Sequence, residues 1–371
     1  MTIRRSLRAS LRRVGSATAV GLSVCASAWA AFAITGLGEP EPKPAVLPTL
    51  RERVFVDRID IDAFHKGNLH AHSAESDGDV PPADVYRWYR DHGYAFVALT
   101  DHNRRIDPAS YAHLERPTFA ILPGEEITMT GAGKPVHVNA ICHRRKIGGG
   151  TFDTKSLALT FALEKIEEQG AIALVNHPNF DRALDLDDLW GARATTLLEI
   201  WSGHPYVYSA GVDGRPSHEE LWASMLSRGA DVFGVAVDDS HHFATNPTAK
   251  PARPGRAWIA TFASTPDKVT RDGVCNAIRA GQFYASSGAE LTRIAVAERT
   301  ITIRPADPMA RVEFIGPGST VLSASNAAGE GAVYRMRGDE EWVRARIVDS
   351  RGEIAWTQPF RTMVREAAPV P

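Results

Sequence analysis

Apolar segments with strand character alternate with helical patterns between about residues 54 and 288. Several of these segments are nearly continuous apolar runs, which is typical of strands that are covered on both faces. The strand candidates are residues 94–100, 118–124, 136–142, 171–176, 196–201, 232–237 and 256–262. Helical patterns lie between them or follow them, at residues 81–93, 155–170, 216–229 and 265–281, where Thr265 offers a helix cap. This repetition predicts an α/β fold with a mainly parallel sheet, and about seven such units are enough to close a TIM-like barrel.

The pattern changes after about residue 289. Segments such as "RIAVAERTITIRPA" and "EWVRARIVDSRGEIAWTQPF" alternate between apolar and polar positions, with turn residues between them and no helical pattern. Such alternation is typical of antiparallel strands. The sequence therefore predicts a barrel domain over residues 54–288, followed by a small antiparallel β-rich domain over residues 289–371.

The first 38 residues differ in kind from the rest of the chain. Five arginines precede an uncharged run from Val14 to Gly38, and the Pro-rich stretch "EPEPKPAVLP" follows it. Such a run is typical of a signal peptide, although its length also suits an uncleaved membrane anchor. We expect a signal peptide or anchor over residues 1–38 and a spacer over residues 39–53. The protein should then be exported, either to the periplasm or to the outer side of a membrane that tethers it.

Composition changes this picture little. Charged residues make up 23% of the chain and hydrophobic residues 44%, as in ordinary globular proteins, and a formal net charge of -2 gives no indication of a nucleic-acid partner. Cys142 and Cys275 are the only cysteines beyond the leader, and the sequence leaves open whether they pair. Neither lies in a Cys-x-x-Cys motif, so a thiolate metal site has little support.

Residues that can ligate a metal follow or lie within most strand candidates of the first domain. These are His70 and His72, Asp101-His102, Glu125-Glu126, His137, Asn176-His177 and the run from Asp238 to His242. The carboxyl ends of the strands of a parallel barrel lie on one face, so these residues should converge there. Side chains at i and i+2 of an extended segment point the same way, which pairs His70 with His72 and Asp239 with His241. A single His-x-His pair is weak on its own, but the joint pattern predicts a multinuclear metal site.

The motifs "HAHSAESDG", "LTDHN", "PGEEIT", "HVNAI", "NHP" and "DDSHH" resemble those of the polymerase and histidinol phosphatase (PHP) superfamily of metal-dependent hydrolases. The resemblance covers roughly residues 60–290. The details "GEEIT" and "HVNAI", together with the β-rich segment after "FYASSGAEL", are most similar to the branch that includes the carbaryl (carbamate) hydrolases. The resemblance implies a distorted (β/α)7 TIM-like barrel with two or three divalent metal ions at the carboxyl ends of its strands.

The resemblance also implies a set of ligands. Strand period leaves the choice between Glu125 and Glu126 open, but the family motif has one residue between the glycine and the glutamate, which selects Glu126 as a bridging ligand. We expect Glu126 and Asp239 to be catalytic as well, with His204 protonating a leaving group. The nine expected metal ligands are His70, His72, Asp77, His102, Glu126, His137, His177, Asp239 and His241.

The chemistry of these ligands suits zinc, manganese or iron, because imidazoles and carboxylates are present without thiolates. Metals bridged by a carboxylate would lower the pKa of a bound water and polarise the ester under attack. We expect the second ring nitrogens of the ligand histidines to bind neighbours such as Asp101 or Asp238. Two basic loops, with Arg104 and Arg105 in one and Lys250, Arg253 and Arg256 in the other, could bind an anionic group, although exposed basic residues are usually just solvated.

The leading prediction is therefore an extracytoplasmic metal-dependent phosphoesterase that acts on a small-molecule ester. A carbamate or carboxylic ester hydrolase would use the same site, so the motifs do not separate the two. The third alternative is a non-catalytic binding module of the envelope. A degenerate enzyme should have lost ligands, and none is missing here.

Overall fold

The computed structural model describes residues 52–54, 58–191, 197–244, 251–263, 265–327, 329–361 and 363–365. The predicted leader, most of the predicted spacer and Lys250 lie outside the described residues. No helix in these ranges is long and apolar enough to cross a membrane.

A six-stranded sheet forms one side of the metal-ligand region. Its strands run in the order β11-β10-β9-β7-β6-β8. Their bounds are β6 Gly124–Gly131, β7 Lys134–Ile141, β8 Thr151–Phe152, β9 Ile172–Val175, β10 Leu197–Ser202 and β11 Phe233–Val237. Strands β9, β10 and β11 are parallel, whereas β7 is antiparallel to both β6 and β9. The reason is local: only Ala132 and Gly133 separate β6 from β7, both with positive φ, and a two-residue connection makes a hairpin.

A ten-stranded sheet forms the other side, in the order β17-β16-β19-β20-β13-β12-β3-β4-β5, with β21 paired to β19. The bounds are β3 Phe64–Asn68, β4 Phe96–Ala98, β5 Ala120–Leu122, β12 Trp258–Phe262, β13 Phe283–Ser286, β16 Arg311–Gly316, β17 Thr320–Asn326, β19 Trp342–Val348, β20 Ile354–Thr357 and β21 Phe360–Arg361. Strands β3, β4 and β5 are parallel, and the other pairs are antiparallel.

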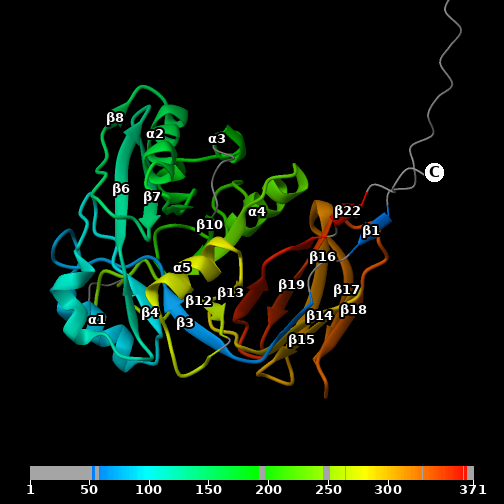
Figure 1. Cartoon of the computed structure of the whole chain (residues 1–371). Helices are drawn as coiled ribbons and strands as arrows, with labels where there is room; N and C mark the ends of the chain where they lie inside the picture. The colour runs from blue at the N-terminus through cyan, green and yellow to red at the C-terminus, as the bar shows by residue number, and fades with distance from the viewer. Residues whose placement is uncertain are drawn as a thin grey trace, which may run out of the picture. The chain divides into compact units, whose positions relative to one another are not determined.

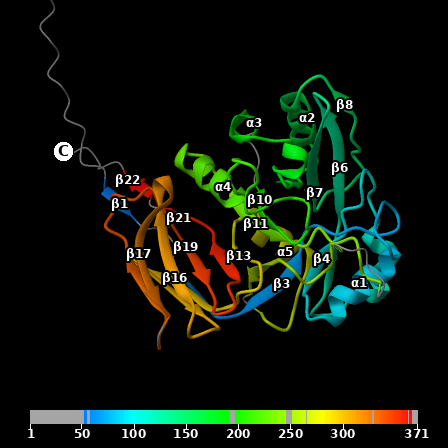
Figure 2. The same ribbon diagram turned by 180° about the vertical axis from the view of Figure 1, so that it is seen from behind.

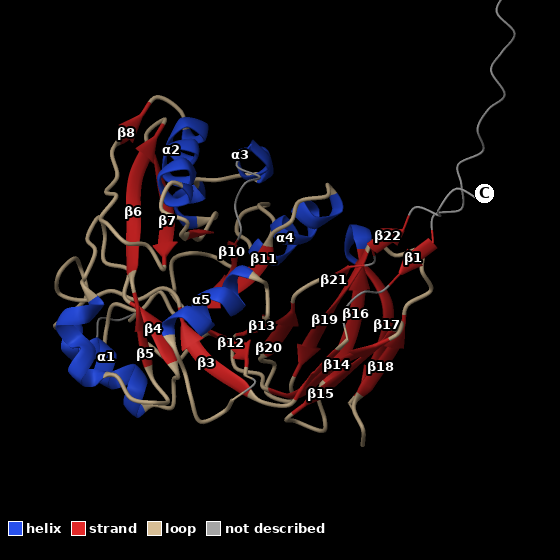
Figure 3. Cartoon of the chain, viewed as in Figure 1, coloured by secondary structure: helices blue, strands red, loops and turns tan. Residues whose placement is uncertain are grey.

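Two isolated bridges join the sheets. His102 pairs with Glu126, and Ala71 pairs with Ser240, both in the parallel sense. The α/β class is confirmed, but the described residues do not show the distorted (β/α)7 barrel that the resemblance implies. Instead the chain forms a sheet-rich arrangement, in which an antiparallel hairpin interrupts the parallel strands and single bridges connect the two sheets (Figure 3).

Helices cover the outer faces of the strands. They are α1 Pro82–Asp91, α2 Lys155–Glu167, α3 Leu186–Gly191, α4 His218–Ser227 and α5 Arg271–Arg279, with short 3-10 helices at Pro108–Leu114, Phe180–Arg182 and Pro317–Ser319. Helix α2 lies beside β6 and β7 in both views (Figures 1 and 2). The expected cap at Thr265 is wrong: α5 begins at Arg271, because the Thr270 side chain accepts a hydrogen bond from the Gly273 N–H.

The strands after residue 289 are antiparallel. A four-stranded sheet in the order β18-β15-β14-β2 comprises β2 Ile59–Ile61, β14 Leu291–Ala297, β15 Thr300–Pro305 and β18 Ala332–Arg335, and β1 Glu52–Val54 pairs with β22 Met363–Arg365. This sheet shares a hydrophobic core with β16 and β19, through Ile294, Ile303, Phe314 and Ile347. Strand β20 pairs with β13, so strands on both sides of residue 289 belong to one continuous sheet. The exact domain boundaries stay predictions.

Cys142 and Cys275 form a disulfide bond, with their Cα atoms 6.3 Å apart. The bond joins the end of β7 to α5, across a sequence separation of 133 residues. Because α5 contacts β5 and β12 of the ten-stranded sheet, the bond links this helix to a strand of the other sheet.

Candidate metal centre

His70 and His72 lie on the extended segment that follows β3. The Asn68 side chain accepts a hydrogen bond from the His70 N–H at 2.9 Å. The His72 N–H donates to the Ser240 carbonyl at 2.8 Å, and the Asp239 N–H donates to the His70 carbonyl at 3.0 Å. These backbone bonds hold the segment extended, so both imidazoles point to one side, with ring centroids 5.1 Å apart.

The first group of ligand atoms is buried. His70 Nε2 and His72 Nε2 each lie 3.3 Å from Glu126 Oε2, and they lie 3.4 Å and 3.3 Å from Asp239 Oδ1. Despite this proximity, His70 Nε2, His72 Nε2 and Glu126 Oε2 have no hydrogen-bond partner among the described residues. Two ligand atoms bound to one tetrahedral zinc ion would lie about 3.4 Å apart. The spacing of these atoms therefore fits a shared metal ion.

Glu126 faces a second group with its other oxygen. Its Oε1 lies 3.0 Å from His137 Nδ1 and 3.4 Å from His177 Nε2, and it accepts a hydrogen bond from the Asn176 side-chain amide at 2.8 Å. His102 Nδ1 lies 3.0 Å from Glu126 Oε2. A carboxylate with histidines at both oxygens is placed as a bridging ligand would be.

A third group lies toward solvent. The Asp77 carboxylate, whose side chain is 52% exposed, lies 3.4 Å from His102 Nε2, 3.4 Å from His241 Nε2 and 3.5 Å from His72 Nδ1. The first two groups are closed to solvent by comparison. All nine expected ligands thus occur in one cluster, and Asp77 marks its open side.

Burial and charge act against each other here. Burial alone would raise the pKa of Glu126 and of Asp239, but the surrounding histidines hold both pKa values well below the usual range. For His70, burial would lower the pKa, and the Asp239 and Glu126 carboxylates instead raise it well above the usual range. Burial, with help from His241, lowers the pKa of His72 to about 3, so its ring is neutral at pH 7. Ionised carboxylates and the neutral His72 ring are forms that bind metals, whereas His70 would have to release its Nε2 proton when a metal ion binds.

Glu199 is a member of the site that the sequence reasoning missed. His70 Nδ1 lies 2.8 Å from Glu199 Oε1, and the buried Glu199 carboxylate also accepts the His177 backbone N–H. Because a carboxylate can only accept, His70 carries hydrogen on Nδ1, and its Nε2 faces Glu126 and Asp239. A glutamate inside the apolar strand segment "LLEIW" is the signal that could have found it.

The expected partners of the ligand histidines, Asp101 and Asp238, have other roles. Asp101 accepts hydrogen bonds from the Ser73 N–H and hydroxyl and from the Ser76 hydroxyl. Asp238 accepts from the Tyr89 hydroxyl and from the backbone N–H groups of residues 255–257. Both carboxylates therefore hold the loops that carry the ligands, and the expectation that they orient imidazoles is wrong.

The other residues considered from the sequence, Glu125, His204 and Arg104, lie outside the three ligand groups. Glu125 accepts hydrogen bonds from the N–H groups of Ile147 and Gly148, whereas Glu126 faces the histidines of the cluster. His204 is outside the ligand groups, but its ring centroid lies 5.3 Å from that of His241. Its Nδ1 accepts the Tyr206 N–H, so the ring hydrogen of the neutral form is on Nε2, and burial lowers its pKa. Arg104 pairs with the exposed Glu75.

The comparison with protein-family models found no match, and neither did the comparison with curated proteins. Among solved structures, the chain is similar to a two-domain protein from Bacteroides vulgatus containing a predicted PHP-like metal-dependent phosphoesterase, with 15% identity and a TM-score of 0.44 over 85% of this chain and 99% of that chain. An amidohydrolase from Chromobacterium violaceum is 16% identical, with a TM-score of 0.36 over 48% of this chain and 88% of that chain. A protein from Bifidobacterium adolescentis assigned as a metal-dependent phosphoesterase is 14% identical, with a TM-score of 0.37 over 57% of this chain and 94% of that chain. At such low TM-scores a functional assignment depends on the site itself.

Proposed function

We propose that the protein is a PHP-type metal-dependent hydrolase that cleaves phosphoesters with two or three divalent metal ions. One observation carries this proposal: buried nitrogens of His70, His72 and His137 face Glu126 and Asp239 oxygens at 3.0–3.4 Å, yet these nitrogens and Glu126 Oε2 have no hydrogen-bond partner among the described residues. A buried polar atom without a partner costs about 1–3 kcal/mol, so a cluster of them is unfavourable unless a ligand satisfies it.

The donor set indicates which residues would hold the metals. His70, His72 and Asp239 would share one ion with Glu126, which would also serve the ion held by His137 and His177, and the exposed group around Asp77 would hold a third. Bound divalent metals supply Lewis acidity and an activated water. Zinc, manganese and iron all suit these ligands.

The protein's own groups position the reaction. Glu199 keeps a hydrogen on His70 Nδ1 and so aims Nε2 at Asp239 and Glu126. His204 would donate its Nε2–H to the leaving oxygen, because its Nδ1 is occupied by the Tyr206 N–H. Burial of His70, His72 and Glu126 excludes bulk water from the inner part of the site, which strengthens these interactions.

We also propose that the protein acts outside the cytoplasm. The arginine-rich leader supports this, and so does the disulfide between Cys142 and Cys275, since disulfides persist in oxidising compartments and are rare in the cytosol. Detection of the processed or tethered protein in the periplasmic fraction tests this part of the proposal.

The test of the activity combines metal analysis with a substrate panel. The purified protein should contain two or three equivalents of zinc, manganese or iron, and it should hydrolyse aryl phosphates or phosphodiesters in preference to aryl carbamates. His72→Ala should lose metal and activity, whereas His113→Ala, at an exposed histidine outside the cluster, should lose neither. Activity on the carbamates alone would replace the phosphoesterase with the carbamate hydrolase that the resemblance to the carbaryl branch suggests. A metal-free protein whose stability His72→Ala leaves unchanged would favour a binding module instead.

A further inference from the structure

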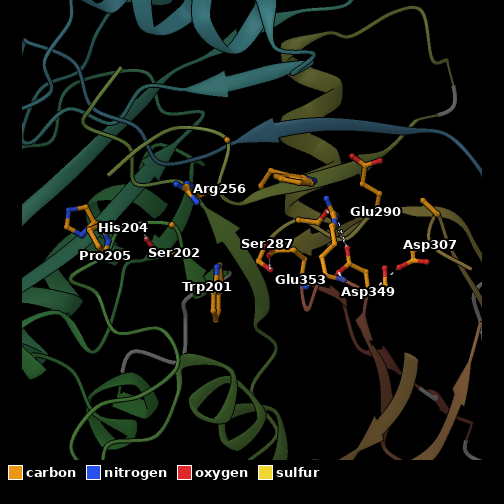
Figure 4. Close-up of a pocket in the computed structure, with 17 residues that line it drawn as sticks. Trp201, Ser202, His204, Pro205, Arg256, Ser287, Glu290, Asp307, Asp349 and Glu353 are labelled. Atoms are coloured by element: carbon orange, nitrogen blue, oxygen red, sulfur yellow. Dashed lines mark hydrogen bonds and ion pairs between the residues drawn. The ribbon is translucent and has the colours of Figure 1, made fainter. Parts of the chain in front are cut away.

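A cavity of about 820 Å³ extends from His204, whose ring centroid lies 5.3 Å from that of His241, to the C-terminal strands (Figure 4). One end is lined by His204 and Arg256, and the other end by loops that follow β13, β15 and β19, with Trp201 among the residues between. Pockets of about 300–1,000 Å³ bind small molecules of drug size. The cavity therefore has room for a substrate that is longer than the group the metals would hold.

Arg256 gives the end near the metal centre a positive charge. Its backbone N–H donates to Asp238 at 2.6 Å, and its side-chain stem packs against Gly203, where an added Cβ would lie 2.5 Å from the Arg256 Cβ. Within the described residues the Arg256 guanidinium has no carboxylate partner within 4.0 Å. It is thus held in place by its backbone, with its charge available to an anionic group.

The far end of the cavity is acidic. Asp307 and Asp349 already have hydrogen-bond partners: Asp307 accepts the Ser350 N–H, and Asp349 Oδ2 accepts hydrogen bonds from Nε and Nη2 of Arg351 at 2.9 Å and 2.7 Å. Glu353 accepts one hydrogen bond, from the Ser287 hydroxyl at 2.8 Å. For the Glu290 carboxylate, the described residues provide no hydrogen bond and no ion pair. Arg351 also lines this end and offsets part of its charge, but the carboxylates of Glu290, Asp307, Asp349 and Glu353 outnumber it and leave the end with a net negative charge.

We infer that this cavity binds a phosphoester in which one substituent carries an ammonium group. The inference rests on the proposed phosphoesterase activity. The phosphoryl group would lie at the metal centre beside Arg256, the substituent would pass Trp201, and its ammonium group would meet Glu290 and Glu353. In the reaction the oxygen of water bonds to phosphorus, the bond from phosphorus to the leaving alcohol breaks, and the alcohol takes up a proton.

The test compares two ligands that differ only in charge. Phosphorylcholine and its neutral isostere, 3,3-dimethylbutyl phosphate, are titrated into metal-loaded protein in a calorimeter, and their p-nitrophenyl esters are assayed as substrates. We expect about tenfold tighter binding of phosphorylcholine, as one well-placed ion pair at a partly exposed site can supply, and a matching preference in KM.

Glu290→Gln should abolish most of this preference by weakening the binding of phosphorylcholine alone, and Glu290→Gln/Glu353→Gln should abolish the rest. Glu290 is exposed, so its substitution should leave the fold intact, and Glu341→Gln, at an exposed glutamate outside the cavity, is the matched control. Equal binding of the two ligands, or no binding of either, overturns the inference. A retained preference in binding without hydrolysis of either ester overturns the phosphoesterase proposal and leaves the cavity's charge selectivity standing.

Discussion

The effect of Glu199→Gln on metal affinity tests the positioning of His70. The wild-type carboxylate accepts both the His70 Nδ1–H, at 2.8 Å, and the His177 backbone N–H. A glutamine of the same shape keeps one acceptor oxygen and presents its NH₂ group to the other donor, so one charge-assisted bond is lost in a fully buried place. Such a bond contributes about 1.5–3 kcal/mol. Changes to a partner that orients a metal-binding histidine typically cost 10- to 100-fold in metal affinity, or about 1.4–2.7 kcal/mol, which agrees with that range.

The assay is competition between the protein and a chelator of known affinity, followed by metal analysis of the protein. Glu168→Gln serves as the matched control, because Glu168 is exposed and its ion pair within the described part of the chain is with Lys165 of α2. Circular dichroism of both variants establishes that they are folded. If folded Glu199→Gln binds metal as tightly as the wild type, Glu199 does not orient a ligand, and the assignment of His70 Nε2 as a metal-binding atom loses its support.

Three further predictions concern stability. Chelator-treated protein should gain about 2.7 kcal/mol of stability, and a higher Tm, when zinc or manganese is added at 100 times the dissociation constant of the metal. If the Tm of His72→Ala rises by the same amount, His72 is not a metal ligand. Cys142→Ser/Cys275→Ser should lower the free energy of unfolding in guanidinium by about 2–5 kcal/mol, since the bond closes a loop of 133 residues; an unchanged midpoint would contradict this. Burial alone would raise the pKa of Glu340, but hydrogen bonds from the Tyr334 hydroxyl and neighbouring backbone N–H groups lower it to about 2, so its stabilising effect is full above pH 4.5 and is lost as the pH falls toward 2. Acid titration of unfolding should show this dependence, and Glu340→Gln should remove it.

The convergence of the ligand residues could be predicted because it follows from local rules. His70 and His72 are two apart on an extended segment, and most of the other ligands lie within or after strands whose apolar runs are visible in the sequence. The ligands converge as long as the ends of these strands lie close together, whatever the arrangement of the individual sheets. The prediction that these residues lie together therefore does not depend on whether the strands form a barrel.

The arrangement of the strands in the two sheets could not be predicted from such local rules alone. The connection between β6 and β7 is too short for a parallel crossover, and its Gly131-Ala132-Gly133 turn indicates a hairpin, so the antiparallel pairing of these two strands could have been predicted. The pairing of β13 with β20 joins residues about 70 positions apart and depends on the packing of the whole chain. The role of Glu199 was hard to predict for the same reason, because it depends on a contact with His70, which is far away in the sequence.

The same residues that would bind the metals also connect the two sheets. The His102–Glu126 bridge and the Ala71–Ser240 bridge are formed by the ligand segments themselves. The hydrogen bonds from the Asp239 N–H to the His70 carbonyl and from the His72 N–H to the Ser240 carbonyl reinforce the second bridge. A metal ion shared by His70, His72, Glu126 and Asp239 would therefore tie together segments from both sheets. Removing it would leave buried carboxylates facing histidines at the very place where single bridges hold the sheets together. Loss of metal should for this reason loosen the junction between the sheets before it affects the antiparallel strands around β14 and β15, an order that hydrogen exchange of the backbone amides can measure.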